Sequence, residues 1–221
     1  MNLSLMKLKD MSPELMLHEL RAFGGERLYD AAIFAAYYHR NDTRGPRGAF
    51  PRDMYINHCY RVALRLVRWG VTDLDIIVAA VLHDVYEDHK DDIEADFGVD
   101  ALQHIEAVFG ARVAALVYAV SNPPGKLTLE QYQAHVFELM VLAQAFVIKF
   151  SDWNDNALSL QHTPGPRRGR LARKYLPLAD PFRARLHDAD VQYILGASGA
   201  ASAIQSLDSG VPRLRQFAEE D

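Results

Sequence analysis

The chain has 221 residues, 49% of them hydrophobic, which suits one domain with or without a tail and argues against two full domains. A formal net charge of −5 argues against nucleic acid as the main partner, and no run of about 18 apolar residues is available to span a membrane. The single cysteine, Cys59, excludes an intramolecular disulfide framework, and the N-terminus lacks a signal-peptide pattern, so we expect a soluble, cytoplasmic protein.

The first part of the chain predicts helices separated by glycine and proline. Residues 1–25 are expected to form an N-terminal helical segment that begins at Ser12-Pro13 and ends at Gly24-Gly25, and a second helix is expected over 26–38. Residues 41–52 read as a loop with three arginines, suited to binding phosphate or to simple solvation. The next helix runs to Gly70 and carries His58 in its first turn.

The most informative stretch is a predicted helix from about 73 to 88. Four polar side chains end it, namely His83, Asp84, Glu87 and Asp88. At about 100° per residue these four share one side, while the apolar residues fall on the opposite arc. The pattern predicts a helix that is buried on one face and chemically functional on the other.

The remaining segments also favour helix. Short amphipathic segments lead to a break at 121–126, and a long helix then starts at Thr128 and continues through residue 148 toward 160. Asp152 and Asn156 are four residues apart and therefore share a face of it. No segment demands a strand, so we predict an all-α fold, with a main domain over 26–195 and a C-terminal helical tail over 196–221.

Two histidines and two aspartates are the candidate metal ligands: His58, His83, Asp84 and Asp152. Nitrogen and oxygen donors in this mixture suit a divalent ion such as manganese, iron or zinc. Because 25 residues separate His58 from His83, and 68 separate Asp84 from Asp152, the ion would lie between three helices. An ion that prefers six ligands would keep positions open for substrate and water, whereas four closed ligands around zinc would make a structural site.

These motifs resemble the hydrolase domain of RelA/SpoT proteins, within the HD phosphohydrolase superfamily. The resemblance covers roughly residues 30–180 and rests on an ordered set of motifs: Tyr55-Ile56-Asn57-His58, Leu82-His83-Asp84 with Glu87-Asp88, Phe97-Gly98, and Lys149-Phe150-Ser151-Asp152 with Asn156. Since no synthetase domain follows, the chain is most similar to the small alarmone hydrolases. The implied fold is an HD-domain helical bundle with a metal site between helices.

The resemblance implies manganese-dependent removal of the 3′-diphosphate from guanosine tetra- or pentaphosphate. It implies that His58, His83, Asp84 and Asp152 bind the metal and that Glu87 and Asp88 position or deprotonate the attacking water. It also implies substrate contacts for four residues, namely Arg47, Asn156, Tyr175 and Lys126. For Lys126 the alternative is a solvated side chain.

Two departures from the family pattern leave the substrate open. Trp153 and Gly48 stand where basic residues are usual. One alternative is therefore an HD enzyme that hydrolyses another phosphorylated nucleotide, such as a nucleoside 5′-monophosphate, a deoxynucleoside triphosphate or the 2′-phosphate of NADPH. A second alternative is a nucleotide sensor without turnover, against which the intact Glu87 and Asp88 argue. The sequence leaves the oligomeric state undetermined.

Overall fold

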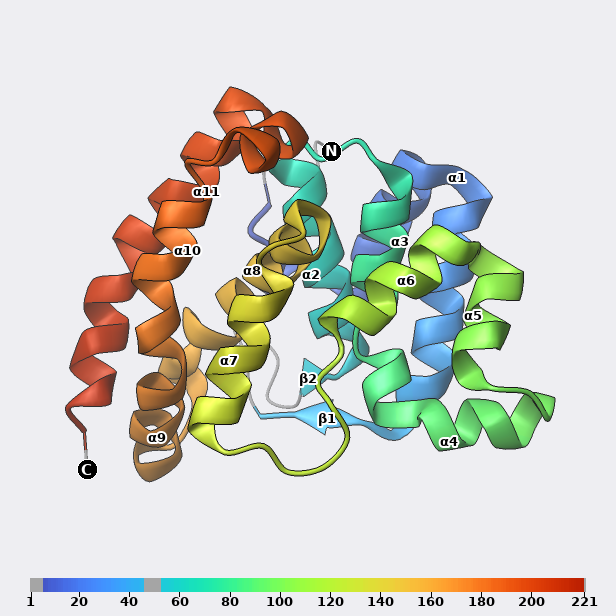
Figure 1. The fold of residues 1–221 in the computed structure, drawn as a ribbon, viewed down its shortest axis with the longest axis horizontal. Helices are drawn as coiled ribbons and strands as arrows, with labels where there is room; N and C mark the ends of the chain where they lie inside the picture. Colours follow the sequence, from blue (N-terminus) through green and yellow to red (C-terminus); the bar gives the residue numbers. More distant parts are fainter. Residues whose placement is uncertain (1–5, 46–52, 221) are drawn as a thin grey trace.

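A computed structural model describes residues 6–45 and 53–220 of the chain. The predicted all-α fold is confirmed, since α-helices dominate this part of the chain and pack side by side (Figure 1). The α-helices are α1 (Pro13–Tyr38), α2 (Ile56–Arg68), α3 (Leu74–Leu82), α4 (Val85–Phe97), α5 (Ala101–Phe109), α6 (Ala111–Val120), α7 (Leu129–Leu139), α8 (Ala143–Ala157), α9 (Gly165–Tyr175), α10 (Ala179–Arg185) and α11 (Ala189–Ala218). Short 3-10 helices are η2 (Leu8–Asp10), η3 (His39–Asn41), η4 (Leu160–His162) and η5 (Leu176–Leu178).

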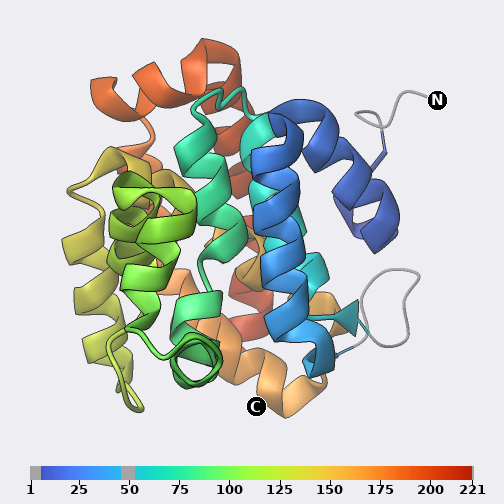
Figure 2. The same cartoon turned by 90° about the vertical axis from the view of Figure 1, so that its right-hand side faces the viewer.

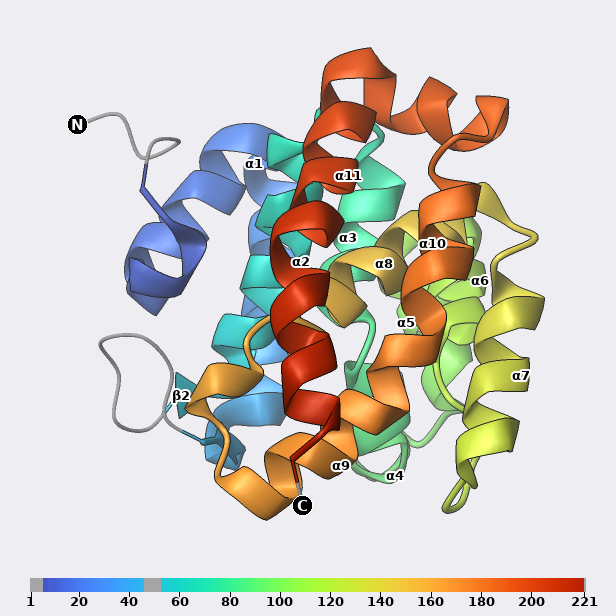
Figure 3. The same ribbon diagram turned by 90° about the vertical axis from the view of Figure 1, so that its left-hand side faces the viewer.

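Helices α2, α3 and α8 form the centre of the molecule. Helix α1 packs against α2 and α3 on one side, where Figure 2 shows it running along the bundle. Helix α11 covers α8 on the other side and descends toward α9, as Figure 3 shows. Helix α2 is buried along most of its length, including its polar residues His58 and Arg61. Burial of polar groups is costly unless they are paired, so these buried polar residues indicate a functional site in the interior.

Helix α1 contains the break that the glycines predicted. Gly25 adopts a left-handed conformation with φ 62°, which glycine accepts without steric cost, and two helical stretches meet there. Buried residues before the break, such as Met16 and Leu20, belong to the same hydrophobic core as Ala203 and Leu207 of α11.

The prediction of one helix over 73–88 is wrong. Helix α3 ends at Leu82, and α4 starts at Val85, so His83 and Asp84 lie in the turn between them. The carbonyl of Ala80, which a continuous helix would use for the Asp84 amide, accepts a hydrogen bond from His83 Nδ1 at 2.8 Å. The two ligand candidates therefore project from a helix junction and not from one face of a helix.

The prediction of one long helix from Thr128 onward is also wrong. Helix α7 ends at Leu139, and Leu142 is extended before α8 begins. The guanidinium of Arg185 donates from Nε to the Met140 carbonyl at 2.9 Å, which satisfies a carbonyl that the helix end leaves free. This cation comes from α10, so the local pattern carried no sign of the break.

A hairpin with two residues in each strand lies where the sequence indicated only a loop. Strand β1 (Thr43–Arg44) pairs antiparallel with β2 (Asp53–Met54), with Arg44 opposite Asp53. Strands this short have no detectable period. The hairpin places Arg44 and Asp53 beside the start of α2. Among the helices described, none is both long and apolar enough to cross a bilayer.

Candidate metal centre

The four predicted ligands converge between α2, the α3–α4 turn and α8. His58 Nε2 lies 3.4 Å from Asp84 Oδ2 and 3.2 Å from Asp152 Oδ1, while His83 Nε2 lies 3.1 Å and 3.9 Å from the same two oxygens. Ligands about 2.1 Å from one ion are separated by about 3.0 Å when adjacent in an octahedron. His58, His83 and Asp84 offer ligand atoms within 4.8 Å of one another, a group that could hold a metal ion, and Asp152 lies beside the two imidazoles.

Both imidazoles are oriented for metal binding. His58 Nδ1 donates to Asp155 Oδ2 at 2.8 Å, and His83 Nδ1 donates to the Ala80 carbonyl at 2.8 Å. In a neutral ring this leaves the lone pair on Nε2. Each Nε2 is buried and makes no hydrogen bond within residues 6–45 and 53–220. The two orphaned nitrogens point at the carboxylates, which is the arrangement expected around a cation.

The carboxylates of Asp84 and Asp152 are kept ionised. Burial opposes this, but His83 and His58 hold the pKa of Asp84 well below its usual range. For Asp152, burial likewise opposes ionisation, and the charge of buried Lys149, whose Nζ lies 3.2 Å from Asp152 Oδ2, lowers the pKa. Burial would lower the pKa of His83, yet Asp84 raises it to about 9, so the site attracts positive charge.

A buried ion-pair network holds His58 through Nδ1, the ring nitrogen opposite the candidate ligand atom Nε2. Asp155 accepts from His58, from Arg61 Nε at 3.0 Å and from Arg65 Nη2 at 2.8 Å. Arg61 also donates to buried Asp53 at 2.8 Å. Arg44 Nη1 also lies 3.7 Å from Asp155 Oδ2, so three arginines face the two aspartates, and the network fixes the His58 ring. The sequence reading missed Asp155, although its position three residues after Asp152 on the same helix was a usable signal.

Asp155→Asn is expected to weaken metal affinity by about 10–100-fold, the usual scale for loss of a group that orients a histidine ligand. Metal titration of the purified variant measures this. Asn154→Ala, on the same helix but hydrogen-bonded to Ser206, is the matched control and should keep wild-type affinity. Equal affinity in Asp155→Asn and wild type would show that the ring needs no such support.

Glu87 and Asp88, the predicted catalytic pair, occupy different surroundings. The Glu87 carboxylate accepts from the backbone and side-chain amides of Asn122 at 3.0 and 2.8 Å, which ties α4 to the loop after α6. Asp88 follows Asp84 by one helical turn, with its amide bonded to the Asp84 carbonyl at 2.9 Å. Partial desolvation and the charges of Asp84 and Glu87 raise the pKa of Asp88 to about 6, which suits a group that exchanges protons near neutral pH.

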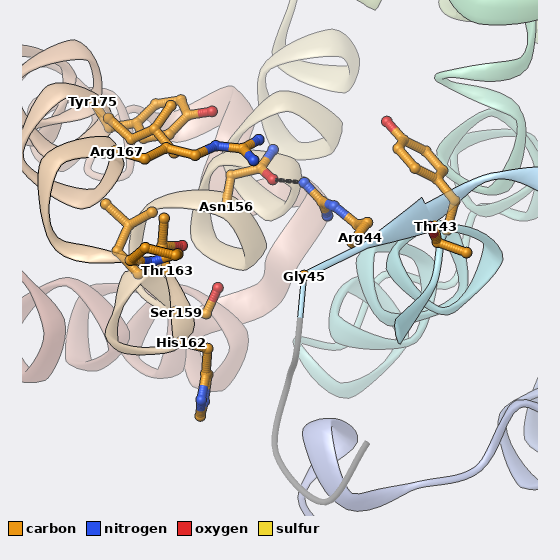
Figure 4. A pocket seen from close by; sticks show the side chains of 13 residues that line it. Thr43, Arg44, Gly45, Asn156, Ser159, His162, Thr163, Arg167 and Tyr175 are labelled. Atoms are coloured by element: carbon orange, nitrogen blue, oxygen red, sulfur yellow. Dashed lines mark hydrogen bonds between the residues drawn. The ribbon is translucent and has the colours of Figure 1, made fainter. Parts of the chain in front are cut away.

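A cavity of about 310 Å³ opens beside the ligands. Tyr55 and Asn156 line it and also contact the ligands, since Tyr55 donates to Asp84 Oδ2 at 2.8 Å and Asn156 donates to Asp152 Oδ1 at 2.5 Å. Figure 4 shows Arg44 and Arg167 approaching Asn156 from opposite sides, with Tyr175 above. The volume lies within the usual range for small-molecule sites, and two arginines suit an anionic ligand.

The predicted substrate residues fall into three groups. Asn156 and Tyr175 line this cavity, and burial raises the pKa of the Tyr175 phenol to about 12. Lys126 instead lines a neighbouring cavity of about 820 Å³, together with Glu87. Arg47 lies outside the described residues, as does Gly48, whereas Arg44, which the sequence reading did not select, bonds to Asn156 Oδ1.

Trp153, the departure noted next to Asp152, is a core residue. Its indole donates to the Tyr175 carbonyl at 3.1 Å, and its ring packs against Phe150 and Phe182. It therefore supports the cavity wall from the protein core. The arginines that line the 310 Å³ cavity are Arg44 of the hairpin and Arg167 of α9.

The fold and the site together define an all-helical protein with a buried His/Asp group that could hold a divalent metal. The chain matches the HD domain family over residues 31–187. It also shares 30% identity over 182 residues with guanosine-3′,5′-bis(diphosphate) 3′-pyrophosphohydrolase MESH1 of Danio rerio, covering 80% of this chain and 88% of that protein. The chain belongs to the HD domain family.

Two further comparisons agree with this assignment. A guanosine-3′,5′-bis(diphosphate) 3′-pyrophosphohydrolase of Aquifex aeolicus is 31% identical over 159 residues, which is 70% of this chain but only 21% of the relative. The chain thus spans about a fifth of that longer protein. A solved structure, described as a metazoan ortholog of SpoT that hydrolyses ppGpp, superposes with a TM-score of 0.64 at 24% identity, covering 86% of this chain and 96% of the other, and so shows the same fold.

Proposed function

We propose that this chain is a metal-dependent hydrolase that removes the 3′-diphosphate from guanosine 3′,5′-bis(diphosphate). The proposal rests on direct contact between the cavity and the ligand candidates. Tyr55 and Asn156 both line the cavity; Tyr55 hydrogen-bonds to Asp84, and Asn156 hydrogen-bonds to Asp152. A phosphorylated nucleotide in the cavity would have a phosphate next to the metal centre. The activities of the relatives named above support this substrate.

The residues would divide the work as follows. His58, His83, Asp84 and Asp152 hold the divalent ion, for which we propose manganese, with iron and zinc as alternatives. When bound, such an ion stabilises charge on phosphoryl oxygens and favours deprotonation of water. Arg44 and Arg167 pair with the phosphates, and Tyr175 lies where a nucleoside would be held.

In the reaction, a water oxygen forms a bond to the phosphorus attached to the ribose 3′ oxygen, and the bond from that phosphorus to the 3′ oxygen breaks. We assign the proton of the water to Asp88, because it follows the ligand candidate Asp84 by one helical turn and its partial desolvation favours proton uptake. Glu87 holds the loop that carries Lys126. The proton that Asp88 accepts passes to the leaving 3′ oxygen, so the products are guanosine 5′-diphosphate, with a free 3′ hydroxyl, and pyrophosphate.

Arg44→Ala is expected to raise KM by about 10–150-fold, since a hydrogen bond to a charged group contributes roughly 1.5–3 kcal/mol. The effect on kcat should be smaller. Steady-state kinetics on Arg44→Ala, Arg47→Ala and the exposed Arg40→Ala compare the three arginines directly. A wild-type KM in Arg44→Ala would remove it from the substrate site, and a raised KM in Arg47→Ala would support the substrate role predicted from the sequence.

A nucleotide panel tests the substrate class. The manganese-loaded protein is incubated with ppGpp, a nucleoside 5′-monophosphate, a deoxynucleoside triphosphate and NADPH, and released phosphate and pyrophosphate are quantified separately. We expect turnover of ppGpp to exceed that of the others by at least two orders of magnitude. Faster turnover of any other member would replace the proposed substrate, and no turnover at all would indicate a sensor.

A further inference from the structure

A second group of possible metal ligands lies apart from the four residues described above. It consists of His39 in η3, Asp42 just before β1 and His89 in α4. His39 Nδ1 lies 2.9 Å and His89 Nε2 lies 2.8 Å from the same oxygen, Asp42 Oδ2, and the two nitrogens are 3.2 Å apart. Three ligands about 2.0–2.2 Å from one ion would be separated by about 2.8–3.1 Å in an octahedron and about 3.3–3.6 Å in a tetrahedron. Two of the observed distances match the octahedral spacing, and the third lies between the two spacings.

The orientation of His89 supports an ion at this place. Its Nδ1 donates to Asp92 Oδ2 at 2.9 Å, so a neutral ring carries its lone pair on Nε2. That lone pair faces the Asp42 carboxylate, which is unfavourable unless a cation lies between them. A carboxylate that fixes a histidine ligand through the opposite nitrogen is a common feature of metal sites. Helix α4 departs from helical geometry at this residue, with φ −130° and ψ 20°.

His39 is buried and its ring is held in place. It stacks on Tyr55 with ring centroids 4.6 Å apart at 23°, and its Nε2 has no hydrogen-bond partner in the described part of the chain. Tyr55 is also the residue that donates to Asp84. One tyrosine thus connects the second group to the first, and an ion there would join the end of α1 to α4.

We propose that His39, Asp42 and His89 form a second transition-metal site. Two imidazole nitrogens and one carboxylate oxygen suit zinc, and three protein ligands leave a position open for water or a phosphate oxygen. The site is separate from the proposed hydrolase centre, because it shares no ligand with it. Its alternative occupant is a proton on His89, which the hydrogen bonds to Asp42 and Asp92 would also accommodate.

Zinc stoichiometry distinguishes the two occupants. The untagged protein is stripped with chelator, equilibrated with zinc, freed of excess ion and analysed for metal and melting temperature. Wild type should hold two equivalents of zinc. His89→Ala and Asp42→Asn should each hold one equivalent, because they lose the ion of the second site. Asp152→Ala should also hold one equivalent, because it loses the ion of the first centre. Exposed His187→Ala is the matched control and should hold two.

Cobalt substitution supplies a readout that is independent of both activity and folding. The visible absorption of bound cobalt should contain two components, of which His89→Ala removes one and Asp152→Ala removes the other. One equivalent in wild type, or two equivalents retained in both His89→Ala and Asp42→Asn, would overturn the second site. Neither result would bear on hydrolysis at the first centre, because Asp152→Ala reports on that centre alone.

Discussion

Asp152→Ala is expected to bind no manganese at the hydrolase centre, to show no ppGpp hydrolysis above background and to be less stable than wild type. The variant loses the proposed ligand that would connect α8 to α2 and the α3–α4 turn. It also leaves Lys149, whose Nζ lies 3.2 Å from the carboxylate, as a buried and unpaired cation. Breaking a buried pair in this way costs roughly 3–5 kcal/mol of unfolding free energy.

Metal analysis, pyrophosphate release and thermal unfolding on the same preparation measure the three effects of Asp152→Ala. Asp180→Ala, which removes an exposed carboxylate from α10, is the control and should match wild type in all three. Full manganese occupancy with unchanged melting in Asp152→Ala would contradict the ligand assignment. Addition of manganese should raise the melting temperature of wild type but not of this variant, since metal binding is linked to folding.

Asp88→Asn is expected to lower kcat by about 10²–10⁴-fold while manganese affinity and KM stay near wild type. The amide keeps the shape of the side chain but cannot accept a proton, and a positioned base contributes to the transition state by about this factor. Kinetics with metal analysis measure the split between kcat and KM. Asp91→Asn, an exposed aspartate in the same helix, is the control.

Glu87→Gln should lower kcat by a smaller factor than Asp88→Asn, because the amide oxygen still accepts from Asn122. The double variant should lose less than the product of the two single effects, because the effects of neighbouring residues are seldom additive. Near wild-type kcat in both single variants with manganese bound would make the pair an ordinary acidic stretch of α4.

The four ligand candidates could be selected from the sequence, but the geometry that presents them could not be predicted. His58, His83, Asp84 and Asp152 stand in recognisable motifs, and the structure brings them together. The helical placement of His58 and Asp152 holds, on α2 and α8, whereas His83 and Asp84 lie in a turn that the sequence treated as part of one helix over 73–88. The break depends on a side chain competing for the Ala80 carbonyl, and helical periodicity contains no information about that contact.

Long-range contacts explain the other differences. The hairpin is too short for a pattern, yet it places Arg44, which was not selected from the sequence, at the cavity opposite Arg167. The end of α7 is held by Arg185 from a helix about 45 residues further on. Asp155 became significant only when α8 lay against α2, where it meets two arginines and His58.

We expect the cavity and the His/Asp centre together to cleave a 3′-diphosphate. The most direct measurement is product analysis of metal-stripped protein, reconstituted with manganese and given ppGpp in excess. We expect guanosine 5′-diphosphate and pyrophosphate in equal amounts, formed only after manganese is added and abolished by Asp152→Ala. An intact substrate in the presence of fully bound manganese, or release of orthophosphate in place of pyrophosphate, would contradict the account.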